Sequence, residues 1–402
     1  MWPFDRGKGL SYGGTPLEKP SIVDRARELF GRGRSHQAHL DETEVRIGVS
    51  GIRGKSSTAK RLGSVLTERG YDTYTKITGD HPTSYHNGRT IPIQRRGPRV
   101  TLYENLNLLR EFVPQLTETE PEDAIVMENQ AITEYTMRMV NERFLRPNVL
   151  LFCNVRQDHN DTLGETRQDI ARSFARSVPE GCHVISDEQH GAIHDYLKEE
   201  IEARGATIEQ VDVPERHRHL TGAETVHMLN HVLDHLGEPR IDDAELHSML
   251  DAIQPEWTDL PDGRVFNAAK VNEIESTELF RRQLAGTGDD AELVCPFVFL
   301  RRDRRGRTAS FVEYIDILFE RGLIDRVHVG GAYTGVFARR VDGPATEHDT
   351  DATDAETVLD RLLATDQPVM FMANTVHPFM RELADEVETR ERSERPPELP
   401  AY

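Results

Sequence analysis

The chain has 402 residues, with 69 acidic and 49 basic side chains and a formal net charge of −20. This length predicts two or three domains, and the negative charge argues against non-specific binding to nucleic acid. The sequence has no apolar run of about 18 residues, so no transmembrane helix is expected, and its first residues lack the apolar core of a signal peptide. The cysteines Cys153, Cys182 and Cys295 are scattered and odd in number, which indicates buried thiols in a reducing cytoplasm.

The first 43 residues are expected to form an N-terminal extension. Within it, residues 21–30 carry apolar side chains at helical spacing. The pattern fits a short amphipathic helix that packs on its own domain. Contact with a membrane or a partner is the alternative.

Residues 45–69 follow the pattern strand, glycine loop, helix. A Val- and Ile-rich run leads into Gly51-Ile-Arg-Gly54-Lys55-Ser56-Ser57, and a helix-like segment follows to Arg69. Such a loop directs backbone N–H groups and a helix N-terminus at a phosphate, while the lysine contacts the β- and γ-phosphates and the serine a Mg²⁺ ion. The strict G-x-x-x-x-G-K-[ST] pattern is not met, because Val49 stands in place of its first glycine. The shorter G-x-x-G-K-S form is met and predicts a nucleotide site.

Strands and helices then alternate through a first domain expected at residues 44–253. The predicted strands are 73–77, 124–127, 149–155, 183–186 and 208–211. The predicted helices are 103–112, 131–144, 165–177 and 189–204, with two more within 220–252. Residues 79–100 lack periodicity and are expected to form a functional loop. The alternation favours a mostly parallel sheet with helices on both faces.

A linker is predicted at 254–263, followed by a smaller α/β domain at 264–388. Its predicted strands are 265–268, 293–300, 327–329 and 369–372. Its predicted helices are 274–285, 307–322, 353–364 and 377–388. Residues 342–354 are expected to form a surface loop, and 389–402 a mobile tail.

Polar residues follow three predicted strands of the first domain. They are the phosphate loop, Glu128 after an apolar strand, and the segment Asn154-Val-Arg-Gln-Asp158-His159-Asn-Asp161. Ligands of parallel α/β sheets bind at the carboxyl ends of strands. Oxygen ligands suit Mg²⁺, and a second divalent ion can accept an imidazole. Each group alone has an ordinary explanation, as a helix cap or a loop pair. Together they predict a metal–nucleotide site.

These motifs, in this order, resemble the Mur ligase superfamily, which includes the peptidoglycan amino-acid ligases and folylpolyglutamate synthase. The chain is most similar to the ligase subunit of poly-γ-glutamate synthesis, the CapB/PgsB family. Two further motifs support the resemblance: Lys76-Ile-Thr-Gly79 after the second strand, and Arg301-Arg-Asp303-Arg304-x-x-Arg307-Thr308 in the second domain. The resemblance implies a P-loop ATPase domain followed by a Rossmann-like C-terminal domain.

The resemblance further implies an ATP- and Mg²⁺-dependent carboxylate–amine ligase that works through an acyl phosphate. Lys55 and Ser57 would belong to the phosphate-binding loop with Gly51 and Gly54. Metal ligands would be Ser56 and Glu128 for one ion and His159 for a second, while Asn154 and Asp158 would shape that loop. The second domain would contribute nucleotide contacts through Lys270, Asn272, Asp303 and Arg304. Arg304 also fits an ordinary surface arginine.

The implied substrates are glutamate and a growing γ-glutamyl chain, and the implied partner is a small multispanning membrane subunit of the CapC/PgsC type. Such a partner would place the protein at the inner face of the membrane. The protein could also form a homo-oligomer. A different acceptor, as in folate-polyglutamating or cell-wall ligases, is one alternative. A P-loop NTPase that acts as a switch or a partner-driven motor is another.

One observation limits the transfer. Many Mur ligases carry a carbamylated lysine in the helix that corresponds to residues 165–178. Here the segment has no lysine, and Phe174 stands near that place. We therefore expect no carbamate bridge between metals. His227, His231 and His235 recur on one helix face, and an exposed polar stripe is favoured over a zinc site.

Overall fold

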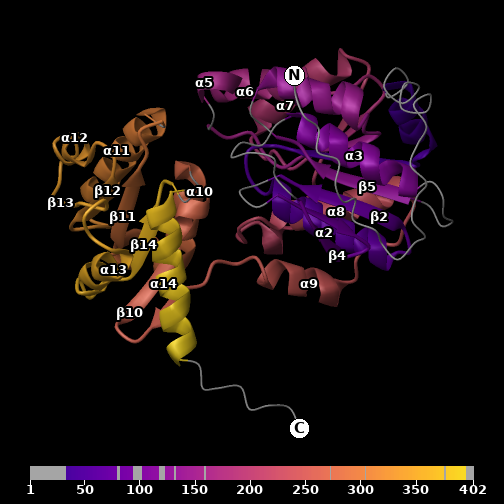
Figure 1. Cartoon of the computed structure of the whole chain (residues 1–402). Helices are drawn as coiled ribbons and strands as arrows, with labels where there is room; N and C mark the ends of the chain where they lie inside the picture. Colours follow the sequence, from indigo (N-terminus) through magenta and orange to yellow (C-terminus); the bar gives the residue numbers. More distant parts are fainter. Residues whose placement is uncertain are drawn as a thin grey trace, which may run out of the picture.

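The computed structural model describes residues 33–78, 82–93, 102–116, 123–130, 133–157, 160–271, 273–303, 305–374 and 377–394. Two sheets, each covered by helices, form separate bodies that are joined by the chain after α9 (Figure 1). This arrangement confirms the predicted fold class, a mostly parallel α/β domain followed by a smaller one. No helix within the described ranges is both long enough and apolar enough to cross a membrane.

The first sheet has eight strands in the described part of the chain. From edge to edge they are β4 (Arg89–Pro92), β3 (Thr83–His86), β2 (Asp72–Ile77), β5 (Asp123–Glu128), β1 (Val45–Ser50), β6 (Val149–Phe152), β7 (His183–Ser186) and β8 (Thr207–Gln210). The six strands from β2 to β8 pair in parallel, while β3 and β4 are antiparallel. The carboxyl ends of β5, β1 and β6 therefore lie side by side.

Helices cover both faces of this sheet. They are α2 (Lys55–Glu68), α3 (Leu102–Leu116), α4 (Glu134–Met139), the π-helix η1 (Val140–Phe144), α5 (Asn160–Leu163), α6 (Arg167–Ala175), α7 (Gly191–Glu202), the 3₁₀ turn η2 (Glu215–His217), α8 (Ala223–Leu236) and α9 (Asp243–Asp251). Strand side chains alternate between faces. Ala124 and Val126 of β5 pack with α2 and α8, whereas Ile125 and Met127 pack with α3.

The second sheet has six strands in the described residues. In order they are β13 (Ala345–His348), β12 (Val327–Gly331), β11 (Cys295–Leu300), β14 (Val369–Met372), β10 (Gly263–Asn267) and β9 (Thr258–Leu260). Only the β9–β10 pair is antiparallel among them. The accompanying helices are η3 (Ala268–Lys270), α10 (Ile274–Ala285), η4 (Gly288–Asp290), α11 (Arg305–Glu320), α12 (Thr334–Ala338), α13 (Ala355–Leu363) and α14 (Pro378–Glu394).

Several predicted loops contain regular structure. Residues 79–100 were expected to be irregular, but they hold the β3–β4 hairpin, which turns at Asn87-Gly88 with φ of 45° and 74°. An Asn-Gly pair favours this two-residue turn because both residues tolerate positive φ. Strand β9 lies in the predicted linker 254–263, and β13 lies in the predicted loop 342–354. Both were missed because they are short edge strands.

Regular structure is also found beyond the predicted elements at both ends of the described part of the chain. Helix α14 continues to Glu394, into the segment predicted as a mobile tail, and its last turns carry Arg–Glu pairs four residues apart. The predicted helix 21–30 lies outside the described residues. Residues 33–42 are helical. They pack on the first domain through buried Leu40 and a 2.7 Å hydrogen bond between His36 Nε2 and the Phe144 carbonyl.

The histidines of α8 do not form an exposed stripe. His227 is buried and lies 3.0 Å from His217, measured between Nε2 and Nδ1. His231 accepts a hydrogen bond from the Asp212 backbone N–H and contacts Glu209, and only His235 is exposed. The prediction is wrong for His227 because η2 covers that end of the helix.

Candidate functional site

The loop predicted to bind phosphate lies between β1 and α2, at the centre of the first sheet. Gly51 has φ of +122°, and Gly54, the N-cap of α2, has φ of +83°. A Cβ atom at Gly51 would lie 2.9 Å from the Cys153 backbone nitrogen and 3.0 Å from that of Asn154. Only glycine allows this close approach of two backbone segments. The loop thus needs its first glycine for packing against the end of β6.

Asn154 holds the loop from the neighbouring strand. Its side-chain oxygen accepts a hydrogen bond from the Arg53 backbone N–H at 3.0 Å, and its side-chain nitrogen donates to the Arg53 carbonyl at 3.2 Å. Its own carbonyl accepts from the Ile52 N–H at 3.2 Å. A single amide side chain therefore satisfies the loop backbone that would otherwise need water or ligand.

Ser56 and Glu128 come together at the start of α2. Ser56 Oγ donates to Glu128 Oε2 at 2.8 Å, and the backbone N–H of Thr78 donates to the same oxygen at 2.7 Å. Glu128 is only 4% exposed and is paired in register with Val49 at the end of β1. A hydroxyl and a carboxylate oxygen side by side form a donor pair of the kind that Mg²⁺ prefers. The residues present thus fit part of a hard-cation site.

Lys55 and Ser57 lie in the first turn of α2. Lys55 Nζ donates to the Ile52 carbonyl of the loop at 3.0 Å. Ser57 is exposed, and its hydroxyl donates to the Gly54 carbonyl at 2.9 Å. Lys55 therefore lies against the loop that is predicted to hold the phosphates, whereas Ser57 supports the turn.

The other predicted site residues divide into two groups. His159, Asn272, Arg304 and also Asp158 lie outside the described residues, so their roles stay predictions. No group of three His, Cys, Asp or Glu side chains with metal-binding geometry occurs within the described ranges. The full ligand set predicted with His159 is therefore untested.

In the second domain, Lys270 is exposed at the end of η3. Asp303 forms an ion pair with Arg301, at 2.7 Å, just after β11. Arg307 of α11 donates to Asn374 Oδ1 at 2.6 Å, next to the end of β14. The Arg301–Thr308 motif thus lies at the carboxyl ends of two neighbouring strands, β11 and β14.

The sequence analysis missed two carboxyl groups near the loop, of which Asp187 is buried and Glu224 half-buried. Asp187 follows β7 and is 5% exposed, and its Oδ1 has no hydrogen-bond partner among the described residues. Burial raises its pKa, with a further contribution from Glu224. Burial also raises the pKa of Glu224 itself, in the first turn of α8. Position at a strand end would have indicated Asp187, but nothing local marks Glu224.

Phe174 occupies a closed apolar site on α6. It is fully buried, and its ring centroid lies 5.7 Å from that of Phe152 on β6. An uncompensated lysine there would have to bury its charge at high cost.

Comparison with known proteins shows what this arrangement resembles. Residues 258–390 match the family model described as the poly-gamma-glutamate synthase CapB C-terminal domain. The match covers β9 through most of α14, including the Arg301–Thr308 motif, and it confirms the resemblance predicted from that motif.

Two curated relatives carry the same name. The chain is 29% identical over 178 residues to PGA synthase CapB of Bacillus subtilis (strain 168), and 29% identical over 179 residues to the capsule biosynthesis protein CapB of Bacillus anthracis. The matched segment is 44% of this chain in both cases. It spans 43% and 37% of the length of these relatives, so less than half of each is matched.

Solved structures of Mur ligase relatives share the fold across nearly the whole chain. E. coli FolC in complex with ADP has a TM-score of 0.59 at 15% identity, over 91% of this chain and 94% of its own. A bifunctional folylpolyglutamate synthase/dihydrofolate synthase from Yersinia pestis, complexed with AMPPNP and Mn, gives 0.57 at 16%, over 93% and 95%. MurF from Acinetobacter baumannii gives 0.55 at 14%, over 89% and 79%. The chain has the two-domain Mur ligase fold.

Proposed function

We propose that the protein is an ATP-dependent acid–amino acid ligase, and that it extends poly-γ-glutamate. The observation that carries the proposal is the contact of Ser56 with buried Glu128 beside a glycine loop at the centre of the sheet. The CapB C-terminal match of the second domain supports the choice of substrate. Folds of this kind with bound ADP, or with AMPPNP and Mn, support a nucleotide and a divalent cation, for which we propose ATP and Mg²⁺.

The proposed reaction has two steps. An oxygen of the acceptor's γ-carboxylate attacks the γ-phosphorus of ATP, and ADP leaves, so that an acyl phosphate forms. The amine of the incoming glutamate then attacks the acyl carbon, phosphate leaves, and the amine loses a proton. Charge builds on the phosphoryl oxygens in the first step, and positioned cations and N–H groups stabilise it.

Each loop residue has a role in that scheme. The N-terminus of α2, with Gly54 as its N-cap, receives the phosphates, Gly51 allows the loop to pass close to the end of β6, and Lys55 supplies a positive charge to the β- and γ-phosphates. Ser56 and Glu128 hold the divalent cation, which neutralises phosphate charge when it is bound. Ser57 keeps the first turn of α2 in place through its bond to Gly54.

The remaining roles come from residues that lie farther along the chain. We assign to His159 a second divalent cation. We assign nucleotide contacts to Lys270, Asn272, Asp303 and Arg304 of the second domain. The substrates are glutamate and a growing γ-glutamyl chain, and the proposed partner is a small multispanning membrane subunit of the CapC/PgsC type that would bring the enzyme to the inner face of the membrane.

The decisive assay measures phosphate release from ATP with and without glutamate and a γ-glutamyl acceptor. Stimulation by glutamate together with product of higher mass supports the proposal. Stimulation only with a folate or cell-wall acceptor would assign the protein to another ligase class. Phosphate release that is indifferent to every amino acid tried would favour an NTPase switch and refute the ligase.

Two variants test the site. Lys55→Ala should abolish turnover and leave the circular dichroism spectrum intact, since the side chain bonds the Ile52 carbonyl of the loop and lies outside the apolar core. Lys60→Ala is the matched control, because Lys60 is exposed on the same helix and its Nζ lies 5.7 Å from the centroid of the Tyr85 ring, away from the loop. Near-normal activity of Lys55→Ala would overturn the assignment of the phosphate loop.

A further inference from the structure

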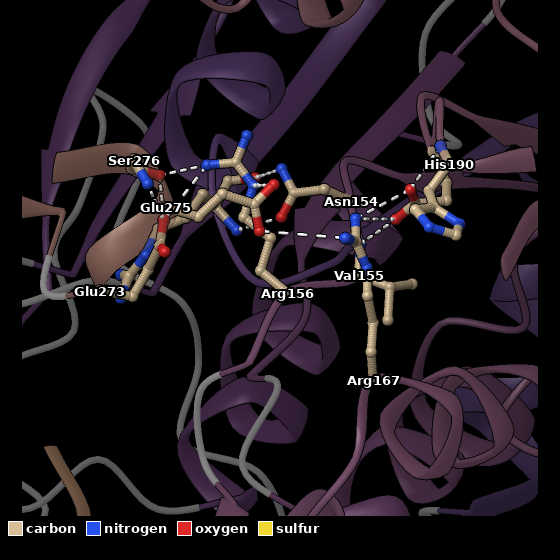
Figure 2. Close-up of polar contacts among 10 residues, drawn as sticks. Asn154, Val155, Arg156, Arg167, His190, Glu273, Glu275 and Ser276 are labelled. Atoms are coloured by element: carbon tan, nitrogen blue, oxygen red, sulfur yellow. Dashed lines mark hydrogen bonds and ion pairs between the residues drawn. The ribbon is translucent and has the colours of Figure 1, made fainter. Parts of the chain in front are cut away.

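A charged network joins the two domains beside the candidate site (Figure 2). Arg156, four residues after β6, donates from Nη1 to Glu273 Oε1 at 3.1 Å and to Ser276 Oγ at the start of α10. Its Nε lies 3.7 Å from Glu275 Oε1. One arginine of the first domain thus contacts three residues of the second.

Arg167 forms the other half of the network. It donates to both oxygens of Glu188, at 3.0 and 3.2 Å, and lies 4.0 Å from Glu275 Oε2. Glu188 is 2% exposed and also accepts from the backbone N–H groups of Val155 and His190, at 2.9 and 2.8 Å. Glu188 therefore anchors Arg167 and the end of β6 to each other.

These contacts are largely withdrawn from water. The Arg156 side chain is 19% exposed and that of Glu273 is 5% exposed. Burial alone would lower the pKa of Arg156, but Glu273 and Glu275 raise it overall. Glu273 also caps α10, because its Oε1 accepts from the Ser276 backbone N–H at 2.8 Å. Screening by salt is weaker for such partly buried pairs than for surface pairs.

The positions of the partners along the chain give the network its meaning. Arg156 lies two residues after Asn154, whose side chain holds the phosphate loop at Arg53. On the other side, Glu273 lies three residues after Lys270. The network thus links the segment that shapes the loop to the segment in which we place nucleotide contacts of the second domain.

Two further hydrogen bonds between the domains, among the described residues, are of a different kind. Thr221 Oγ1 donates to Gln283 Oε1 at 2.6 Å, and Gln283 Nε2 donates to Gln254 Oε1 at 2.6 Å, all between exposed or half-buried neutral groups. Neutral, solvent-exposed hydrogen bonds contribute little net free energy, so they fix the relative orientation of the domains only weakly. The charged contacts at the N-terminus of α10 are therefore the ones that define the angle between the domains.

We propose that Arg156 is a positioning residue for the ligase reaction. Through Glu273 and Ser276 it holds the N-terminus of α10, and with it Lys270, at the carboxyl edge of the first sheet, and Arg167 completes the hold through Glu275. Arg156 acts by placing the second domain over the nucleotide. The activity readout of this inference rests on the proposed function, whereas its structural readout does not.

The test is a double-mutant cycle on the intact protein with Arg156→Met, Glu273→Gln and both together, measured by small-angle X-ray scattering and steady-state kinetics. Either single variant should raise the radius of gyration, and the double variant should raise it no further, because both break the same contact. We expect kcat to fall about tenfold to a hundredfold, as a small misplacement of reacting groups does. Arg156→Lys, which keeps the charge, should restore most of kcat.

Arg264→Met is the matched control, since Arg264 forms an ion pair with Glu292 within the second domain. It should change neither the radius of gyration nor kcat. An Arg156→Met protein with the radius and the kcat of the wild type would overturn the inference. If the variants have a larger radius of gyration but the wild-type protein shows no glutamate-dependent turnover, the proposed function is refuted, whereas the role of Arg156 in positioning the second domain still stands.

Discussion

Replacement of Gly51 by alanine tests whether the phosphate loop depends on the close approach of two backbone segments. The new Cβ would lie 2.9 and 3.0 Å from the backbone nitrogens of Cys153 and Asn154, at a φ of +122°. The unfavourable φ costs about 1–3 kcal/mol, and crowding against backbone that cannot rotate away adds about 1–3 kcal/mol. We expect Gly51→Ala to lose roughly 2–6 kcal/mol of unfolding free energy as the sum of the two.

Gly70→Ala separates the two contributions. Gly70 also has a positive φ, +97°, but a Cβ there meets nothing within 4 Å. This control should lose only about 1–3 kcal/mol, from the backbone conformation. Both values come from urea unfolding followed by circular dichroism, and ATP affinity from calorimetry should fall only in Gly51→Ala. Equal losses of stability in the two variants, with ATP affinity intact in both, would refute the reasoning.

Three further outcomes follow from buried groups. Burial and the neighbouring His348 lower the pKa of His328 to about 4, so the free energy of unfolding that the neutral imidazole contributes is complete above pH 6.5 and is lost as the pH falls toward 4. Urea unfolding between pH 7.5 and 4.5 should show a decrease of up to about 3 kcal/mol in the free energy of unfolding. The decrease should be smaller in His328→Leu, and the same decrease in that variant would count against the effect of this pair. Cys153, Cys182 and Cys295 are buried, and burial raises the pKa of each thiol. Ellman's reagent should therefore label none of them at pH 8 in the native protein and all three in urea, and rapid labelling of the native protein would contradict this. Phe174→Ala should cost about 3–5 kcal/mol of unfolding free energy, whereas Tyr135→Ala, at a 67% exposed position, should stay within about 0.5 kcal/mol of wild type; similar losses would show that Phe174 is not a core residue.

The fold class could be predicted because the strands of both domains are short apolar runs that alternate with helical periodicity. The errors lie at short strands near the sheet edges, which have too few residues to show a periodic pattern. Strands β9 and β13 are four residues long or less and become strands only against β10 and β12. The Asn87-Gly88 turn was a local signal for the β3–β4 hairpin, and it was overlooked within an apparently irregular stretch.

The candidate site was predictable to the extent that it depends on strand ends. Parallel pairing of β5, β1 and β6 brings Glu128 to Ser56, although 72 residues separate them. The contact of Thr78 with Glu128 and that of Arg156 with Glu273 could not be predicted from one sequence. Both depend on how segments far apart in the chain are placed, and the residues involved have no distinctive local pattern.

The clamp formed by Asn154 has a thermodynamic consequence for ligand binding. Because its amide already bonds both the N–H and the carbonyl of Arg53, the loop needs no ligand to take up its shape. A nucleotide that enters such a preorganised loop loses little free energy to ordering the backbone. Asn154→Ala would transfer that ordering to the binding step, so its weaker nucleotide affinity should appear as a more unfavourable entropy of binding. Asn154 would thereby contribute to nucleotide affinity through the backbone of the loop.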